Sequence, residues 1–194
     1  MPGGRFFSPA APMRAKKKFW RKSSFNFEKN FPHLFLIIAP RHVERASEIE
    51  QQPEPSGFHP LGAAPAGKPA PIVSSSIPPV NCAIGIGVAT VVFIGKSLTA
   101  RGGQNPVEAI LADRPVVFGP HMENFAALAH ALVVHGAARQ PNDQLGLTTT
   151  LEELFRDPEE RARLVAAARG VLAPHRGATA RSAALLEKLS APTF

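Results

Sequence analysis

The chain has 194 residues, of which 44% are hydrophobic and 19% are charged, and it carries a formal net charge of +7. This length suits one core of ordinary size and excludes two full-sized domains. The whole excess charge comes from seven Lys and Arg residues within positions 1–22, where no acidic residue occurs. The rest of the chain is electrically balanced, which argues against nucleic acid as a partner.

Residues 1–30 are predicted to form a poorly ordered basic tail. Its Lys and Arg side chains could contact anionic lipid or nucleic acid, but short basic runs are more often simply solvated. No continuous apolar stretch follows these charges before Phe31, so the tail does not resemble a signal peptide. The longest apolar run, residues 83–95, is shorter than the roughly 18 residues of a membrane-spanning helix, which predicts no transmembrane span.

Cys82 is the only cysteine. A single cysteine excludes an internal disulfide and a cysteine metal cluster, and it favours a reducing compartment such as the cytoplasm. With apolar neighbours it is expected to be a small core residue. No pattern elsewhere predicts a metal site, a bound cofactor or a catalytic residue.

Three continuous apolar runs predict strands buried on both faces of a parallel sheet: residues 34–39, 91–95 and 115–119. Helical patterns lie between and after these runs, and this alternation indicates a doubly wound α/β layer. In such a layer, ligands bind beyond the carboxyl ends of the strands. The candidate ligand-contacting segments are therefore those that follow the strands: residues 40–42, 96–105 and 120–124.

Helix start signals predict where the helices begin. NPVE, from Asn105, places a capping side chain before a proline and an acidic residue. Further starts are predicted at Asn124, at the capping box TLEE from Thr150, and at Asp157. The helix from Asn124 is expected to end at Gly136, and a final amphipathic helix is expected over residues 179–189.

Residues 51–79 do not fit this pattern. The segment is rich in Pro, Gly, Ala and Ser and has no useful period, which is typical of a loop or a disordered linker. A compact α/β domain seldom contains such a long irregular insert. The segment is therefore either a real insertion or the result of a damaged reading frame.

Residues 96–106, KSLTARGGQNP, connect a predicted strand to a predicted helix start. Gly102 and Gly103 would let the backbone approach a ligand closely, and exposed N–H groups at a helix start favour phosphate or carboxylate. The Lys, Ser and Arg side chains of this loop favour the same ligands. The alternative is an ordinary strand-to-helix turn.

Other candidate residues also allow two interpretations. Glu108 either braces the helix cap or accepts hydrogen bonds from ribose hydroxyls, and the residues alone favour the brace. Arg41, with His42 beside it, either grips a phosphate or pairs with a nearby glutamate. A lone histidine such as His121 more often positions backbone than performs acid–base chemistry.

In combination these segments resemble the bacterial 3-deoxy-D-manno-octulosonic acid (Kdo) transferases. FIGKSLTARGGQNPVEA, followed by RPVVFGPHMENF, is similar to a region of that family in which a Ser-Leu turn, GG(H/Q)NP and GPHxxNF occur in this order. FPHLFLIIAPRHVER upstream and HRGAT downstream also fit. The resemblance covers roughly residues 31–50 and 89–189, and it is the combination of motifs that is specific.

The resemblance implies that residues 31–194 form a nucleotide-sugar-binding domain, the Rossmann-like C-terminal domain of a GT-B glycosyltransferase. The family transfers Kdo from CMP-Kdo to a lipid A precursor in lipopolysaccharide biosynthesis, at the cytoplasmic face of the inner membrane. By this resemblance, Arg41 and His42 would lie near the CMP moiety. The loop residues Ser97, Gly102 and Gly103 would face the donor phosphate or sugar. The element that binds the nucleotide would comprise Asn105, Pro106, Val107 and Glu108, with Glu108 as the ribose ligand.

Three departures from the family pattern accompany this resemblance. The acceptor-binding N-terminal domain, with its membrane anchor and general-base carboxylate, has no counterpart. The chain is therefore expected to be inactive alone and to meet the lipid A precursor through that missing domain, while a peripheral contact of the chain with the membrane is left open. In addition, residues 80–83 differ from the family's Gly-Glu-Leu turn, and the basic tail replaces the expected start of the C-terminal domain.

Alternative functions remain open on the sequence. One is a non-catalytic nucleotide-binding remnant, and another is half of a different GT-B enzyme that uses a UDP-sugar. A third is a remnant that binds only electrostatically through residues 1–22. Such binding would collapse with salt and survive the loss of Glu108.

Overall fold

The computed structural model describes residues 5–9, 35–39 and 86–190. Within them, a sheet with the order β2-β1-β3-β4 has parallel neighbours throughout. Its strands are β1 (Arg5–Pro9), β2 (Phe35–Ala39), β3 (Val91–Ile94) and β4 (Val116–Phe118). The three strands predicted from apolar runs are therefore present, and the predicted parallel α/β arrangement is confirmed.

Strand β1 was not expected, because residues 5–9 fall within the predicted basic tail. In the structure Phe6 pairs with Leu36 of β2 on one side and with Val91 of β3 on the other. A five-residue strand is too short to show a period of its own, and only pairing on both sides identifies it. The other residues of the predicted tail, the segment 51–79 and Cys82 lie outside the described residues.

The outer edge of β4 is covered by backbone from the loop after α6 (Ala126–Val134). Val117 and Arg139 form an isolated parallel bridge. The Phe118 N–H donates to the Arg139 carbonyl at 3.1 Å, and the Arg139 N–H donates to the Val116 carbonyl at 3.2 Å. The edge of β4 is thus paired, which prevents it from acting as an open template for another strand.

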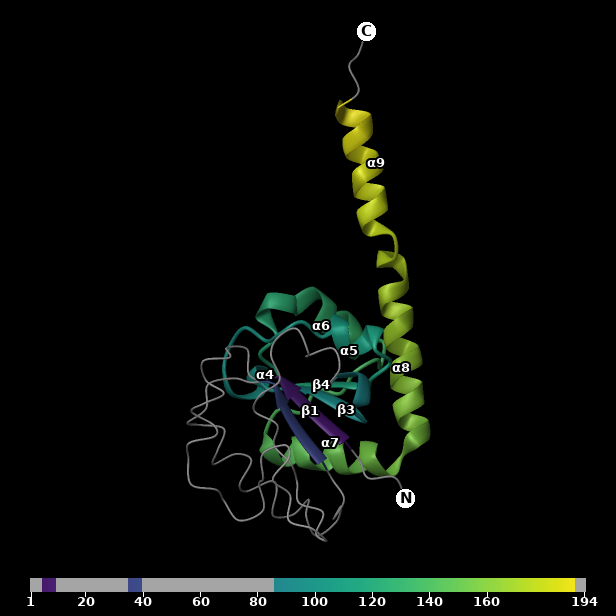
Figure 1. Ribbon diagram of the computed structural model, residues 1–194. Coiled ribbons are helices and arrows are strands. Elements are labelled where there is room, and N and C mark those ends of the chain that lie inside the picture. Colours follow the sequence, from purple (N-terminus) through teal and green to yellow (C-terminus); the bar gives the residue numbers. More distant parts are fainter. Residues whose placement is uncertain (1–4, 10–34, 40–85, 191–194) are drawn as a thin grey trace.

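Helices cover both sides of the sheet (Figure 1). Figure 1 shows α5 and α6 on one side and α7 on the other, while α8 runs along the end of the sheet away from α4 and α9 projects beyond it. Besides α6, the labelled helices and turns have these bounds: α4 (Lys96–Thr99), α5 (Val107–Leu111), η3 (Glu123–Phe125), α7 (Gln144–Arg156), α8 (Pro158–Leu172), η4 (Ala173–His175) and α9 (Ala178–Ser190).

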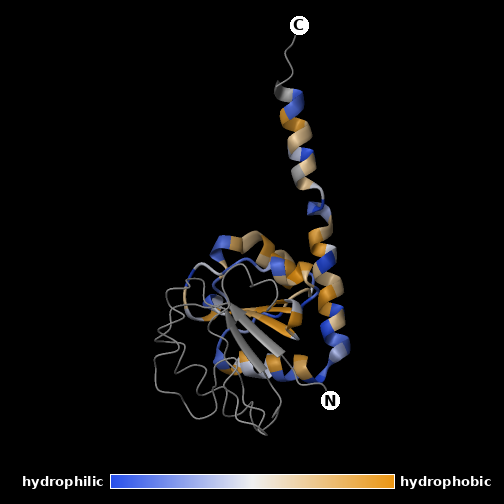
Figure 2. Ribbon diagram, viewed as in Figure 1, coloured by the Kyte–Doolittle hydropathy of each residue, from blue (hydrophilic) through white to orange (hydrophobic). Residues whose placement is uncertain are grey.

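The core forms around β3 and β4, every residue of which is buried. Figure 2 shows apolar residues along these two strands and along α6, and apolar residues alternating with polar ones along α7 and α8. Burying one large aliphatic or aromatic side chain contributes about 1.5–3 kcal/mol. The largest fully buried side chains include Phe93, Phe118, Leu132, Leu151 and Leu164, which come from both strands and from α6, α7 and α8.

Helix α7 begins earlier than predicted. Its N-cap is Asp143, whose carboxylate accepts a hydrogen bond from the Gly146 N–H at 2.8 Å. Thr150 lies inside the helix, so the predicted start there is wrong. The segment before Thr150 contains a glycine and two threonines, which are weak helix formers. Burial of leucines at i, i+4 and i+7 overrides this weak propensity, because Leu147, Leu151 and Leu154 all face the core.

Two other helix signals are confirmed. Asp157 caps α8, since its carboxylate accepts from the Glu160 N–H at 2.9 Å and Pro158 is the first helical residue. Gly136 follows α6 with a φ of +59°, a conformation that glycine adopts more readily than other residues. The predicted helix from Asn124 begins instead as the turn η3, and α6 follows it directly.

The last predicted helix, residues 179–189, corresponds to α9. The side chains described on α9 are all exposed, among them Leu185 and Leu186 at 58% and 66%. Within the described part of the chain, no helix is both long and apolar enough to cross a membrane.

Candidate functional site

Two connections meet at the carboxyl ends of β3 and β4. The β3 loop, residues 95–106, contains α4, and the β4 loop, residues 119–125, contains η3. Figure 1 places α4 beyond the carboxyl end of β3, at the opposite end of the sheet from α8. Parallel strands bring their carboxyl ends to one edge, so these two loops occupy the position at which α/β sheets bind ligands.

The hydroxyl of Ser97 joins the two loops. It is completely buried, donates to the Ile94 carbonyl at 2.5 Å, and accepts from the Gly119 N–H at 2.6 Å. Both bonds are internal to the protein, so this hydroxyl is a structural link in the structure described. A contact of Ser97 with a donor phosphate or sugar stays a prediction.

Two glycines allow the loops to pack closely. A Cβ on Gly119 would lie 2.6 Å from the Leu98 Cα, and one on Gly103 would lie 2.2 Å from the Met122 Sδ. Real Cβ contacts are not this short, so a larger residue at either position would push the loops apart. The three nearest atoms to a Cβ on Gly119 are all backbone atoms, whereas a Cβ on Gly103 would meet the Met122 side chain and, at 2.9 Å, the His121 carbonyl oxygen.

The backbone of His121 is held between the loops. Its N–H donates to the Ser97 carbonyl at 2.8 Å, and its carbonyl accepts from the Gly103 N–H at 2.9 Å. Both bonds use the backbone of residue 121 and do not involve the imidazole, so the expectation that the histidine side chain positions backbone stays a prediction. The imidazole is partly exposed, and its Nδ1 lies 3.4 Å from a carboxylate oxygen of Glu123.

Glu123 makes the second side-chain link between the loops. One carboxylate oxygen accepts from the Gly102 N–H at 2.6 Å, and the other lies 3.3 Å from Arg101 Nε. Gly102 has a φ of +76°, which aims its N–H at this carboxylate without a side-chain clash. Hydrogen bonds from the N–H groups of Gly102 and of Glu123 itself, followed by the nearby His121 side chain, lower the pKa of Glu123 to about 2.

Helix α5 begins one residue later than predicted. Pro106 is its N-cap, and the Asn105 side chain accepts from the Val107 N–H at 3.0 Å. The helix has only five residues, so its dipole is small.

The brace proposed for Glu108 is not made in the structure. A proline N-cap has no N–H for Glu108 to bond, and the Glu108 side chain makes no hydrogen bond with another described residue. Glu108 is exposed in the first turn of α5. Its carboxylate is therefore available to a ligand.

The structure brings most of the predicted site residues to one edge. Those of the β3 loop and α5 lie in adjoining segments, with Asn105 and Glu108 exposed, Val107 half-buried and Pro106 buried. Arg41 and His42 lie outside the described residues. The sequence did not single out Glu123 or Gly119, and the signal that could have pointed to them is the glycine directly after the strand in GPHMENF.

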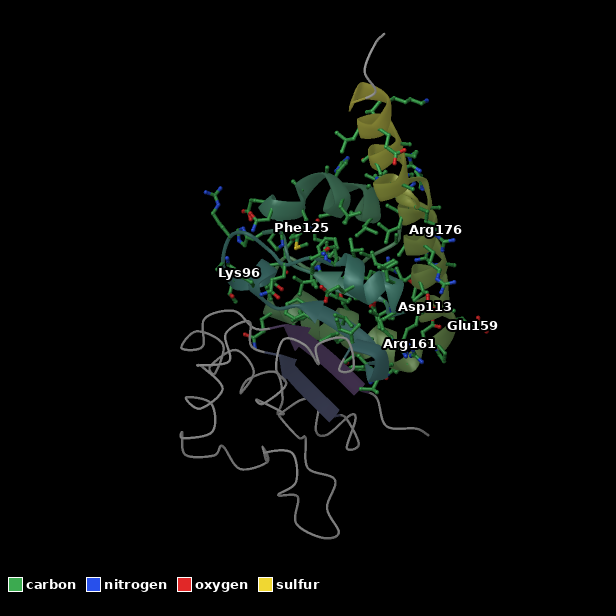
Figure 3. All side chains as sticks on the ribbon, turned by 45° about the horizontal axis from the view of Figure 1, so that its top comes forward. Lys96, Asp113, Phe125, Glu159, Arg161 and Arg176 are labelled. Carbon is green, nitrogen blue, oxygen red and sulfur yellow. The ribbon has the colours of Figure 1, made fainter. Side chains whose placement is uncertain are left out.

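The cationic side chains at this edge suit an anionic ligand. Lys96 and Arg101 come from the β3 loop, and Figure 3 shows Lys96 at the end of the molecule opposite to Glu159 and Arg161. Cationic side chains and backbone N–H groups are the usual partners of phosphate and carboxylate. Within residues 5–9, 35–39 and 86–190, no group of three His, Cys, Asp or Glu side chains is placed to hold a metal ion.

Comparison with known proteins finds several sequence relatives, including the following two. The 3-deoxy-D-manno-octulosonic acid transferase of Bordetella pertussis is 32% identical over 160 residues, which cover 80% of this chain. The enzyme of the same name from Haemophilus influenzae is 30% identical over 81% of this chain. The chain spans 37% and 38% of the lengths of these two transferases. The predicted resemblance to Kdo transferases is thereby confirmed, whereas no family model matches the chain.

Solved structures show the same fold. The C-terminal CMP-Kdo binding domain of WaaA from Acinetobacter baumannii has a TM-score of 0.73 at 19% identity, covering 88% of this chain and 90% of that one. The C-terminal domain of the glycosyl transferase LpcC from Francisella tularensis has a TM-score of 0.60 at 14% identity, covering 90% and 87%. The predicted fold, the Rossmann-like C-terminal domain of a GT-B glycosyltransferase, is confirmed.

Proposed function

We propose that this chain is the donor-binding part of a Kdo transferase and binds CMP-Kdo at the edge formed by the β3 and β4 loops. The observation that carries this proposal is the meeting of the two motif-bearing loops at one end of the sheet. Ser97 and Gly119 join these loops through a buried hydrogen bond. The names of the two sequence relatives and the named ligand of the WaaA domain support the choice of donor.

In this proposal the exposed carboxylate of Glu108 accepts hydrogen bonds from the ribose hydroxyls of CMP. Its position supports this role, because it lies in the first turn of the helix that follows the β3 loop and makes no hydrogen bond with another described residue. Lys96 and Arg101 supply positive charge toward the phosphate and the Kdo carboxylate. Arg41 and His42 complete the nucleotide contacts, from the segment that follows β2.

Transfer itself needs groups that this chain does not supply in our proposal. The chain spans less than two fifths of its transferase relatives. We therefore assign the binding of the acceptor, a lipid A precursor, and the catalytic base to the part of a Kdo transferase that this chain does not span. The natural place of such an assembly is the cytoplasmic face of the inner membrane, where its lipid acceptor is available.

Calorimetric titration of the purified chain with CMP and UMP tests donor binding. We expect saturable binding of CMP that exceeds binding of UMP. Glu108→Ala should weaken CMP binding roughly ten-fold or more, the effect of losing a hydrogen bond to a charged group. Leu111→Ala, which alters a 70% exposed residue of the same helix, is the matched control and should leave affinity unchanged.

Other outcomes point to the alternative functions. A preference for UMP would indicate a transferase that uses a UDP-sugar. Binding that collapses with salt and survives Glu108→Ala would indicate electrostatic contact through the basic residues 1–22. Adding a Kdo transferase N-terminal half, CMP-Kdo and a lipid A precursor then separates an enzyme half from a non-catalytic nucleotide-binding protein, because only the former gives transfer.

A further inference from the structure

The N–H groups of the paired glycines are both already bonded within the protein. The Gly103 N–H donates to the His121 carbonyl, part of the backbone link between the loops. The Gly102 N–H donates to the carboxylate of Glu123. The first bond belongs to a packed backbone, whereas the second is made by a side chain that is 42% exposed. Of these two N–H groups, only that of Gly102 can become available to a ligand without moving backbone.

The Glu123 carboxylate sits where a ligand anion would find partners. Besides the Gly102 N–H, Arg101 Nε lies 3.3 Å and His121 Nδ1 lies 3.4 Å from one of its oxygens. The Lys96 ammonium is also near, since a Cβ built on Gly102 would lie 3.4 Å from its Nζ. A backbone N–H with a guanidinium and an imidazole is a typical set of partners for a phosphate or carboxylate group.

Two further properties fit an exchange of anions at this position. The lowered pKa of Glu123 reports that its surroundings stabilise a negative charge. The Arg101 side chain is 88% exposed, so an anion from solvent can reach it before the Glu123 contact breaks. Glu123 is also the first residue of the short turn η3, so its side chain can rotate away without disturbing a long helix.

We propose that Glu123 occupies the subsite for an anionic group of the donor, so that donor binding requires its carboxylate to leave the Gly102 N–H. This inference rests on the proposed function and specifies the subsite for the donor phosphate. Arg101, Gly102 and His121 form the subsite, and Glu123 is an internal competitor for it. A competitor of this kind reduces the apparent affinity of the donor to its intrinsic affinity multiplied by the fraction of molecules in which the subsite is open.

The test compares CMP with cytidine, which lacks the phosphate, by calorimetry on wild-type chain, Glu123→Ala and Glu123→Gln. We expect both variants to bind CMP more tightly, roughly five-fold for Glu123→Ala, and to bind cytidine as the wild type does. Glu159→Gln removes the same charge from an exposed glutamate at the other end of the molecule and controls for a general electrostatic effect.

A second measurement reports on the contact itself and on folding. The Gly102 amide proton should move upfield in the NMR spectrum of Glu123→Ala, because it loses a charged acceptor, while the resonances of the core strands stay in place. Addition of CMP to that variant should return the Gly102 amide proton downfield. An amide that does not respond to CMP would contradict the proposed subsite.

The outcomes also separate this inference from the proposed function. CMP affinity that is unchanged or weaker in Glu123→Ala, with wild-type binding still dependent on Glu108, would overturn the inference alone and identify Glu123 as a brace. Absence of CMP binding from wild type and from both Glu123 variants would overturn both. Binding of CMP by the wild type, together with roughly five-fold tighter binding by Glu123→Ala, would support both.

Discussion

The buried hydroxyl of Ser97 accepts a hydrogen bond from the N–H of Gly119, which lies 22 positions away in the sequence, at 2.6 Å. The same hydroxyl donates to the Ile94 carbonyl at the end of β3. One side chain thereby joins the ends of two neighbouring strands. It sets the distance between the two loops that carry the candidate site.

Ser97→Ala should destabilise the protein by about 1–3 kcal/mol, because the buried N–H of Gly119 would lose its acceptor. Urea unfolding followed by circular dichroism measures this change. Ser182→Ala alters an exposed serine on α9 and should stay within about 0.5 kcal/mol of wild type. Equal stabilities of the two variants would show that the Ser97 bond is not needed.

The loss of stability caused by replacing a glycine with alanine should depend on the atoms that the new Cβ contacts. Gly119→Ala places a Cβ 2.6 Å from backbone atoms of Ser97 and Leu98, whereas Gly103→Ala places one 2.2 Å from the Met122 Sδ and 2.9 Å from the His121 carbonyl oxygen. Overpacking of this kind costs about 1–3 kcal/mol, and we expect Gly119→Ala to cost more because its three nearest contacts are all backbone atoms, which cannot rotate away.

Gly170→Ala is the matched control for these two variants. Nothing lies within 4 Å of the Cβ that it adds on the exposed side of α8. It should stabilise the protein by about 0.5–1 kcal/mol, since alanine favours a helix interior more than glycine does. Thermal melts of the three variants check the order, and a Gly119→Ala protein as stable as Gly170→Ala would contradict the packing described.

Glu160 should contribute to stability through its two arginine partners. Its carboxylate accepts from Arg163 Nε at 2.6 Å and from an Arg139 guanidinium nitrogen at 2.5 Å, and so it joins α8 to the segment that pairs with β4. The hydrogen bonds from Arg163, with the positive charge of Arg139, lower the pKa of Glu160. Glu160→Gln should cost about 1 kcal/mol in urea unfolding.

Glu152→Gln is the comparison for this prediction. Glu152 pairs with Arg156 one turn along α7 at 3.9 Å. Pairs of this kind contribute about 0.2–0.5 kcal/mol. If both substitutions cost the same, the link from α8 to the edge of β4 adds nothing to stability.

The contribution of Glu123 to stability should depend on pH with a defined sign. Its pKa in the folded protein, about 2, is below its ordinary value of 4.5. A group with a lowered pKa stabilises the fold fully above its unfolded pKa and loses that contribution as the pH falls through its folded pKa. The urea midpoint of Glu123→Gln should therefore lie below that of wild type at pH 7, and the gap should shrink between about pH 4.5 and 2.

This comparison distinguishes the carboxylate contact from a loss of surface charge. Glu159→Gln, measured over the same pH range, accounts for removal of one charge from the molecule. A gap between Glu123→Gln and wild type that is constant from pH 7 to pH 2.5 would contradict the hydrogen bond to Gly102.

Much of the fold could be predicted because its signals are local. The apolar runs of β3 and β4 and the Asp157-Pro158 start of α8 each lie within a few neighbouring residues. Where an element depends on contacts with residues far away in the sequence, the element was not predicted or its start was predicted at the wrong residue. Strand β1 is recognisable only by its pairing, and α7 begins before Thr150 because leucines of its first turns are buried.

By itself, the sequence determined the fold class, the order of the motifs, the resemblance to Kdo transferases and the segments that follow the strands. Only the tertiary structure decided how those segments use their polar groups. In the structure the Ser97 hydroxyl and the Gly103 N–H make hydrogen bonds within the protein, and Glu108 does not make the predicted cap contact. The Glu123 carboxylate accepts a hydrogen bond from the Gly102 N–H. The physical reason is that these contacts join residues about 20 positions apart, and pairing of β3 with β4 brings them within hydrogen-bonding distance.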